Sequence, residues 1–272
     1  MNISVFSLSA IILYLAATLS RFYRKSQPAA ISPKHLLLLL GVLAISLHAL
    51  VLYQEMVTPS GFNFGFFNAA SLIAWVIALL LLLTLLRQPV ENLTLVIFPI
   101  AAITIALEGS FDYEYILSPK TEIGVALHVF FSILAYSLLS LSALQALFLA
   151  LQEYQLHHKR PGWVMQRMPP LQVMETLLFQ MIAVGFILLT LSLISGFVFL
   201  EEDIFAQHMV HKTVLSIAAW CVFALLLWGR RLYGWRGKTA IRWNLIGFVV
   251  LMLAYFGSKM VLELILPRGI GN

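Results

Sequence analysis

Three of the seven histidines in this chain, His48, His128 and His211, lie within long apolar segments. A side chain that can ionise or bind a metal is costly to place inside a bilayer, so it marks a functional site by default. Imidazole is a common axial ligand of haem iron, and two histidines on facing helices can supply both axial bonds. The residue type and its placement therefore indicate haem binding between helices.

His128 begins a row of polar residues in which Ser132, Tyr136 and Ser140 follow at intervals of four. On a helix this spacing places the side chains along one face, and a polar face should turn away from lipid. Two interpretations of His128 stay open at this point. It is an iron ligand, or it forms a hydrogen bond between helices, as polar residues often do in membrane bundles.

The composition indicates that membrane helices position these residues. Of the 272 residues, 61% are hydrophobic and 11% are charged, whereas a soluble domain carries about 25% charged residues. The single cysteine, Cys221, excludes an intrachain disulfide and a site built from several cysteines. The net charge of +5 comes from basic residues between apolar segments, which indicates the lipid bilayer as a partner and no nucleic acid.

We expect an all-α fold, a polytopic membrane helix bundle of about eight transmembrane helices. The expected spans are residues 3–20, 34–57, 66–86, 92–107, 122–152, 172–200, 208–229 and 241–266. The fourth span is short and contains Pro99, so we expect it to be tilted or kinked. No connection is long enough for a soluble domain, so residues 1–272 form a single integral membrane domain, with a four-helix portion at 1–107.

Most of the 17 Lys and Arg residues lie on alternate connections between the expected spans. The basic connections contain Arg21, Arg24, Lys25, Lys34, Arg87, Lys159, Arg160, Arg167, Arg230, Arg231, Arg236, Lys238 and Arg242. Two of the others are acidic and contain Glu108, Asp112, Glu114 and Glu122, and Glu201, Glu202 and Asp203. Because basic connections stay in the cytoplasm, we expect both termini on the outer side.

With this orientation the three histidines lie in the outer half of the membrane. At a rise of 1.5 Å per residue, His128 is about 9 Å, His211 about 5 Å and His48 about 13 Å from the outer ends of their spans. We predict His128 and His211 as the axial ligands of haem iron, with His48 as a deeper second ligand or a transit site. The sequence does not show whether the three side chains face one another.

A series of short motifs resembles the core of the cytochrome c assembly proteins, the haem-handling membrane proteins of the CcsA, CcmC and HemX types. It begins at Leu127-His128-Val129 and ends near Tyr255-Phe256-Gly257. Between them come Tyr136, Gly185-Phe186-Ile187-Leu188-Leu189-Thr190, Ser195-Gly196, Trp220, Trp228-Gly229-Arg230, Gly234-Trp235-Arg236-Gly237-Lys238 and Ile246-Gly247-Phe248. The resemblance covers residues 122–266, which we expect to be the family-like core, and more loosely the region of His48. In one group of the family a His-Lys-Thr like His211-Lys212-Thr213 opens the seventh span.

The resemblance implies haem binding at the outer face and a role in cytochrome c biogenesis. In the family, a Trp-rich outer loop lies between histidine ligands, and His128 matches the outer histidine that precedes this loop. The chain departs from the pattern in three places. Residues 201–208 lack the Trp-rich signature, Trp228-Gly229 replaces a histidine, and residues 264–267 lack the final outer histidine. Either His211 compensates as an axial ligand, or the site serves another purpose.

We therefore predict a bacterial inner membrane protein that binds haem b and holds it or delivers it at the outer face. Its expected partners are haem and cytochrome c maturation proteins or another membrane protein. Walker A, G-x-S-x-G and H-E-x-x-H patterns are absent, so the sequence does not predict an enzyme. Two alternatives remain: a non-haem accessory or scaffold subunit of a transport or maturation complex, and a transporter that uses the polar row of residues 128–140.

Overall fold

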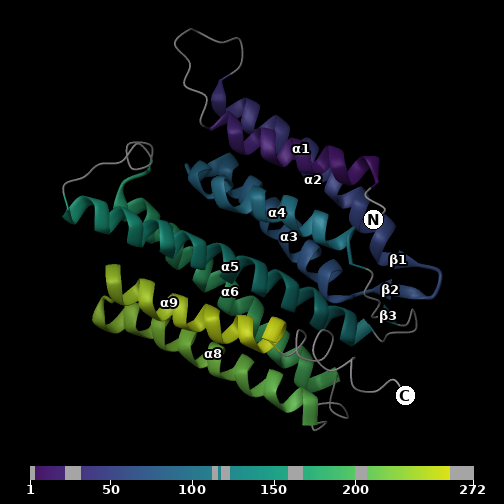
Figure 1. The fold of residues 1–272 in the computed structure, drawn as a ribbon. Coiled ribbons are helices and arrows are strands. Elements are labelled where there is room, and N and C mark those ends of the chain that lie inside the picture. Colours follow the sequence, from purple (N-terminus) through teal and green to yellow (C-terminus); the bar gives the residue numbers. More distant parts are fainter. Residues whose placement is uncertain are drawn as a thin grey trace. The chain divides into compact units, whose positions relative to one another are not determined.

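The computed structural model describes residues 4–21, 32–111, 116–117, 123–158, 168–199 and 207–257 (Figure 1). The chain divides into two compact units, Met1–Lys120 (unit 1) and Thr121–Asn272 (unit 2). The boundary lies between the predicted N-terminal portion, 1–107, and the predicted core, 122–266, both of which stay predictions as domains.

Unit 1 contains the helices α1 (Val5–Ser20), α2 (Pro33–Met56), α3 (Phe66–Arg87) and α4 (Thr94–Glu108). Helix α1 packs against α2 and α4, and α3 packs against α4 and α2. Serine hydroxyls cap the first two helices, because Ser4 accepts a hydrogen bond from the Ser7 backbone N–H and Ser32 accepts one from that of His35. The turn η1 (Glu91–Leu93) leads into α4, which continues through Pro99.

A small sheet lies in the two connections that precede α3 and follow α4, and we did not predict it. Strand β1 (Val57–Thr58) pairs with β2 (Gly61–Asn63), and β2 pairs with β3 (Ile116–Leu117), both antiparallel. Gly61 has a φ angle of 143°, which suits a residue without a Cβ atom at this turn. The sheet therefore joins the ends of α2, α3 and α4.

Unit 2 contains the helices α5 (Ile123–His157), α6 (Leu171–Phe199), α8 (Gln207–Tyr233) and α9 (Gly237–Met252). A π-helical turn, η3 (Leu253–Gly257), continues α9. The long helices α5 and α6 lie side by side, α9 packs against α5, and α8 packs against both α9 and α6 (Figure 1). Close approach of α5 and α6 uses small residues: a Cβ atom on Gly185 would lie 2.7 Å from Leu139 Cδ2.

The surfaces and interiors of the two units have the distribution expected in lipid. Large apolar side chains such as Leu83, Ile103, Val184 and Ile187 are exposed, whereas buried positions include small polar side chains such as Ser142. Ser142 exchanges hydrogen bonds with Asn244 across α5 and α9, at 3.0 and 3.1 Å. Apolar surface toward lipid and polar contacts between helices are typical of membrane bundles.

The predicted fold class, a polytopic all-α membrane protein, is confirmed. In the described part of the chain, seven helices are long and apolar enough to cross a membrane, and α1 is a shorter apolar helix of 16 residues. Observed and predicted ends agree within a few residues for most spans, although α5 extends to His157 and α9 begins at Gly237. Residues 258–266 of the predicted last span lie outside the described residues. The orientation of the termini stays a prediction.

Candidate functional site

His128 lies near the start of α5 and contacts α6 through its ring. Its Nδ1 atom is 2.8 Å from the backbone oxygen of Ser192. Since a carbonyl oxygen only accepts, the ring donates an N–H from Nδ1, and Nε2 keeps its lone pair. Around Nε2, the Ser132 hydroxyl is 3.5 Å away, at the limit of a hydrogen bond. The hydrogen bond to Ser192 thus fixes the tautomer that a metal ligand requires.

Three small residues of α6, Ser192, Ser195 and Gly196, form the surface on which this ring packs, which we call the His128 seat. A Cβ atom on Gly196 would lie only 3.0 Å from His128 Cε1 and 3.1 Å from Nδ1, so a residue without a side chain fits there. The Ser195 hydroxyl donates to the Ser192 backbone oxygen at 2.9 Å. Ser132 and Ser192 join their hydroxyls at 2.6 Å. The Ser195-Gly196 motif of the sequence therefore has a definite role in packing against His128.

The polar row continues along α5 to an aromatic cluster. Tyr136 is buried and packs against Phe248, Tyr255 and Phe256, with ring centroids 6.1, 5.8 and 5.6 Å from its own. The π-helical turn after α9 carries Tyr255 and Phe256, and such turns are frequent at functional sites. His128 and Ser132 thus contact α6, and Tyr136 contacts the end of α9.

His48 belongs to unit 1 and is completely buried. Its Nδ1 atom is 3.2 Å from the Tyr14 hydroxyl, and its Nε2 atom is 3.0 Å from the Ser71 hydroxyl. Both ring nitrogens therefore have hydrogen-bond partners, so iron binding here would require one hydrogen bond to be given up. The role of His48 as a second ligand or transit site stays a prediction.

His211 lies in α8, but its side chain lies outside the described residues, so its pairing with His128 stays a prediction. The hydrogen bonds of His128 and His48 are made within unit 2 and unit 1 respectively. The loop that replaces the Trp-rich signature of the family also lies outside the described residues.

Glu108 is a residue whose environment the sequence analysis missed. We expected it in an acidic connection between spans, and this expectation is wrong because Glu108 is the last residue of α4 and is only 3% exposed. The signal was its spacing: Phe98, Ala101, Ile105 and Glu108 follow one another at three or four residues, and all are buried. Helical periodicity places them on one face.

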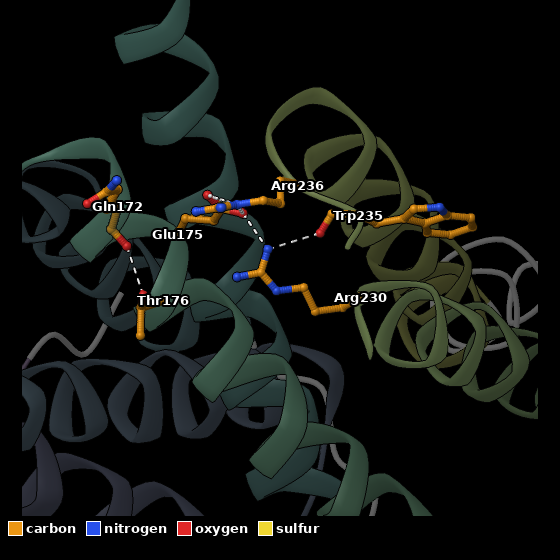
Figure 2. Close-up of polar contacts among 6 residues, drawn as sticks. All are labelled: Gln172, Glu175, Thr176, Arg230, Trp235 and Arg236. Atoms are coloured by element: carbon orange, nitrogen blue, oxygen red, sulfur yellow. Dashed lines mark hydrogen bonds and ion pairs between the residues drawn. The ribbon is translucent and has the colours of Figure 1, made fainter. Parts of the chain in front are cut away.

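At the other end of unit 2, Glu175 joins two arginines (Figure 2). Arg230 Nη1 is 2.9 Å from Glu175 Oε1, and Arg236 Nε is 3.2 Å from the same oxygen. Arg230 also donates to the backbone oxygen of Trp235 at 3.2 Å and lies 4.5 Å from the ring centroid of Phe179. Glu175 thus ties the beginning of α6 to the turn between α8 and α9.

Trp235 fills the space inside this turn. A Cβ atom on Gly229 would collide with the Trp235 ring, and the ring stacks on Trp243 at a centroid distance of 5.8 Å. Gly234 has a φ angle of 64°, which favours glycine. The Trp228 to Lys238 motifs therefore build the α8–α9 turn, and the structure gives them a packing role.

The family model described as "Cytochrome C assembly protein" matches residues 36–266. The chain belongs to the cytochrome c assembly protein family. It is 36% identical to the inner membrane protein YpjD of Escherichia coli strain K12 over 227 aligned residues. The aligned region covers 83% of this chain and 86% of that protein. No solved structure matches the chain.

The chain is also similar, over shorter regions, to the proteins named CcsA and HemX. The cytochrome c biogenesis protein CcsA of Mesostigma viride is 29% identical over 92 residues, 33% of this chain and 30% of that protein. Protein HemX of Bacillus subtilis strain 168 is 27% identical over 133 residues, 48% of each chain. Family membership together with the helical structure identifies a multi-pass membrane protein of the cytochrome c assembly family.

Proposed function

We propose that this protein binds haem b in unit 2 with His128 as an axial ligand, and holds or delivers the haem at the outer face of the bacterial inner membrane. The family suggests a haem-related role in cytochrome c biogenesis. Bound haem would supply an iron centre that can be oxidised and reduced. The partners in this proposal are cytochrome c maturation proteins or another membrane protein.

The hydrogen bond of His128 to the Ser192 backbone oxygen carries this proposal. Histidines that bind metals commonly donate their second ring N–H to a carbonyl or carboxylate, which orients the ring and raises the basicity of the ligating nitrogen. His128 has this arrangement, and its Nε2 has only a 3.5 Å contact with Ser132. The ring is partly buried between two helices. A haem bound there would bury its apolar porphyrin ring away from water.

Helix α8 is the expected source of the second axial ligand. It packs against α6, the helix on which the His128 ring rests, and it contains His211. Trp220 of α8 stacks on Phe186 of α6 at a centroid distance of 5.4 Å and donates to the Thr190 hydroxyl at 2.9 Å. These contacts fix the register of α8 against α6, the helix that His128 also contacts.

One observation favours the alternative of a non-haem scaffold subunit. The hydrogen bond from His128 to Ser192 connects α5 and α6. In a membrane bundle a polar side chain can have no role other than to join two helices in this way. In that case His128 would stabilise the helix pair, and loss of its side chain would change stability without any change in bound cofactor.

The decisive experiment is the absorption spectrum of the protein purified in mild detergent, oxidised and then reduced with dithionite, followed by a pyridine haemochrome assay. We expect near-stoichiometric haem b in the unmodified protein, and loss of nearly all of it in His128→Ala. A colourless protein that also fails to take up added hemin would support the scaffold alternative. Full haem occupancy in His128→Ala would exclude His128 as a required ligand.

His158 provides a matched control. Its Nδ1 atom is 2.8 Å from the backbone oxygen of Tyr154, so it has the same hydrogen bond as His128, but it is exposed. His158→Ala should leave haem occupancy unchanged. Equal losses in both variants would indicate non-specific destabilisation.

A further inference from the structure

A buried row of polar side chains crosses unit 1, and each of its four described α-helices contributes one member. The members are Tyr14 of α1, His48 of α2, Ser71 of α3 and Glu108 of α4. The first three are completely buried, and Glu108 is 3% exposed. The hydroxyls of Tyr14 and Ser71 lie beside the two ring nitrogens of His48. The Ser71 hydroxyl is also the side-chain group that can donate a hydrogen bond to the Glu108 carboxyl.

Glu108 is the exceptional member because its carboxyl lacks strong partners. Neither of its oxygens makes a hydrogen bond within the part of the chain that the structure describes. A charged carboxylate without donors is very costly to bury. The residue is also the last of α4, where the negative end of the helix dipole disfavours a negative charge.

The charged and titratable groups around Glu108 do not relieve this cost. The carboxylate of Glu55, in α2, repels a negative charge on Glu108. The Ser71 hydroxyl can offer one proton, and it is also 3.0 Å from His48 Nε2. The Tyr14 hydroxyl is engaged with His48 at 3.2 Å. The surroundings therefore favour a neutral carboxylic acid.

We propose that Glu108 is a proton-binding site, and that its proton decides which nitrogen of His48 accepts a hydrogen bond. This inference does not rest on haem binding by unit 2. Of the four members of the row, the histidine pattern had indicated His48 alone.

The two states of Glu108 impose opposite hydrogen-bond directions on the row. A neutral Glu108 that turns its O–H toward Ser71 can donate to it; in this state Ser71 donates to His48 Nε2 and His48 donates from Nδ1 to Tyr14. As a carboxylate, Glu108 accepts from Ser71, Ser71 accepts from His48 Nε2–H, and His48 Nδ1 accepts from Tyr14. Between the two states one proton leaves the Glu108 O–H bond for water, while the ring proton of His48 moves from Nδ1 to Nε2. Ser71, His48 and Tyr14 carry one exchangeable proton each in both states, so His48 stays neutral.

The position of Glu108 gives its proton a short path to water. It is the last residue of α4, whereas Ser71 is five residues inside α3, about 8 Å from its end. His48 is eight residues from the end of α2, about 12 Å deep. The row thus runs from the helix end that the predicted topology places outside toward the interior.

Two measurements on the 272-residue chain test the proposal. Infrared spectroscopy at neutral pH should show the carbonyl band of a protonated carboxylic acid that shifts in D2O and is absent in Glu108→Gln. Nitrogen NMR of protein with 15N-labelled histidine, with the His48 signals assigned from His48→Gln, should show Nδ1 protonated. When the pH is raised until the acid band disappears, the ring proton should move to Nε2.

Two variants make the test specific. Glu91→Gln removes a carboxyl from the turn before the same helix and should keep both the acid band and the tautomer change. Ser71→Ala should keep the acid band but abolish the dependence of the His48 tautomer on it. A purely structural role for Ser71 would not separate these two readouts.

Two results would overturn the proposal. The first is the absence of an acid band at neutral pH, which would mean that Glu108 is ionised and held by a cation. The second is an unchanged His48 tautomer after the acid band is lost. If Glu108→Gln does not fold, the same band can be assigned in the unmodified protein by its shift on 13C-labelling of glutamate and by its displacement in Ser71→Ala.

Discussion

His128 is held by the backbone of α6 more than by its side chains. The carbonyl of Ser192 accepts the ring N–H at 2.8 Å, whereas the Ser195 hydroxyl is 3.4 Å from the same nitrogen. A backbone acceptor persists when the serine side chain is changed. The seat is therefore sensitive mainly to the volume of the residues beside the ring.

Gly196→Ala tests this seat. The new Cβ atom would approach His128 Cε1 to 3.0 Å, so the ring must turn away from its preferred position, at a cost of about 0.5–1.5 kcal/mol. We expect haem affinity to fall by about 2- to 12-fold, with a shifted Soret band, in a titration with hemin. Ser195→Ala, which leaves the ring its space, should bind as the unmodified protein does. Identical titrations for the two variants would argue against a site at this ring.

Ion pairs connect the beginning of α6 to the turn between α8 and α9. Glu175 is buried and lies between Arg230 and Arg236 (Figure 2). Arg236 is largely exposed, so its ion pair is screened by water and contributes little. The bond with Arg230 is shorter and better shielded, which makes it the main electrostatic connection between α6 and this turn.

Glu175→Gln should destabilise unit 2 while leaving the proposed haem site intact. The change removes the negative charge between two arginines, and loss of a hydrogen bond to a charged group costs about 1.5–3 kcal/mol. We expect a lower thermal unfolding midpoint in detergent, with an unchanged haem spectrum at low temperature. Thr176→Ala removes only a bond to Gln172 on the same helix and should change the midpoint little. A loss of haem from folded Glu175→Gln would show that the turn is coupled to the site.

On the scale of the whole molecule, the orientation in the membrane determines which surface each site reaches. The β1–β2 turn and the end of α4 lie in connections predicted on the outer side, and the α8–α9 turn with its basic residues lies on the predicted inner side. In this orientation Glu108 and His128 lie near the outer side of the membrane, and the Glu175 cluster lies near the cytoplasmic side.

Cysteine labelling tests the orientation, because the chain has a single cysteine, Cys221. In a Cys221→Ser background, Ser60→Cys should react with a membrane-impermeant maleimide added to intact cells, since Ser60 is exposed in the β1–β2 turn. Lys238→Cys, also at an exposed position, should react only after the membrane is opened. The reverse pattern would invert the topology and place the proposed haem site on the cytoplasmic side.

The membrane class and most helix limits could be predicted from the sequence. Transfer of each residue into lipid depends mainly on that residue and its neighbours along the chain, so the spans are encoded locally. The row of His128, Ser132, Tyr136 and Ser140 was predictable for the same reason, since helical spacing alone puts these residues on one face. The family motifs likewise lie in continuous stretches of sequence.

Tertiary structure decided what each polar group contacts. It assigned the backbone oxygen of Ser192 to His128, occupied both nitrogens of His48, and buried Glu108 without a hydrogen-bond partner among the described residues. It also joined Glu175 to arginines more than fifty residues away. Such contacts depend on which side chains of distant segments come within about 3 Å, and this distance is fixed only when the helices pack.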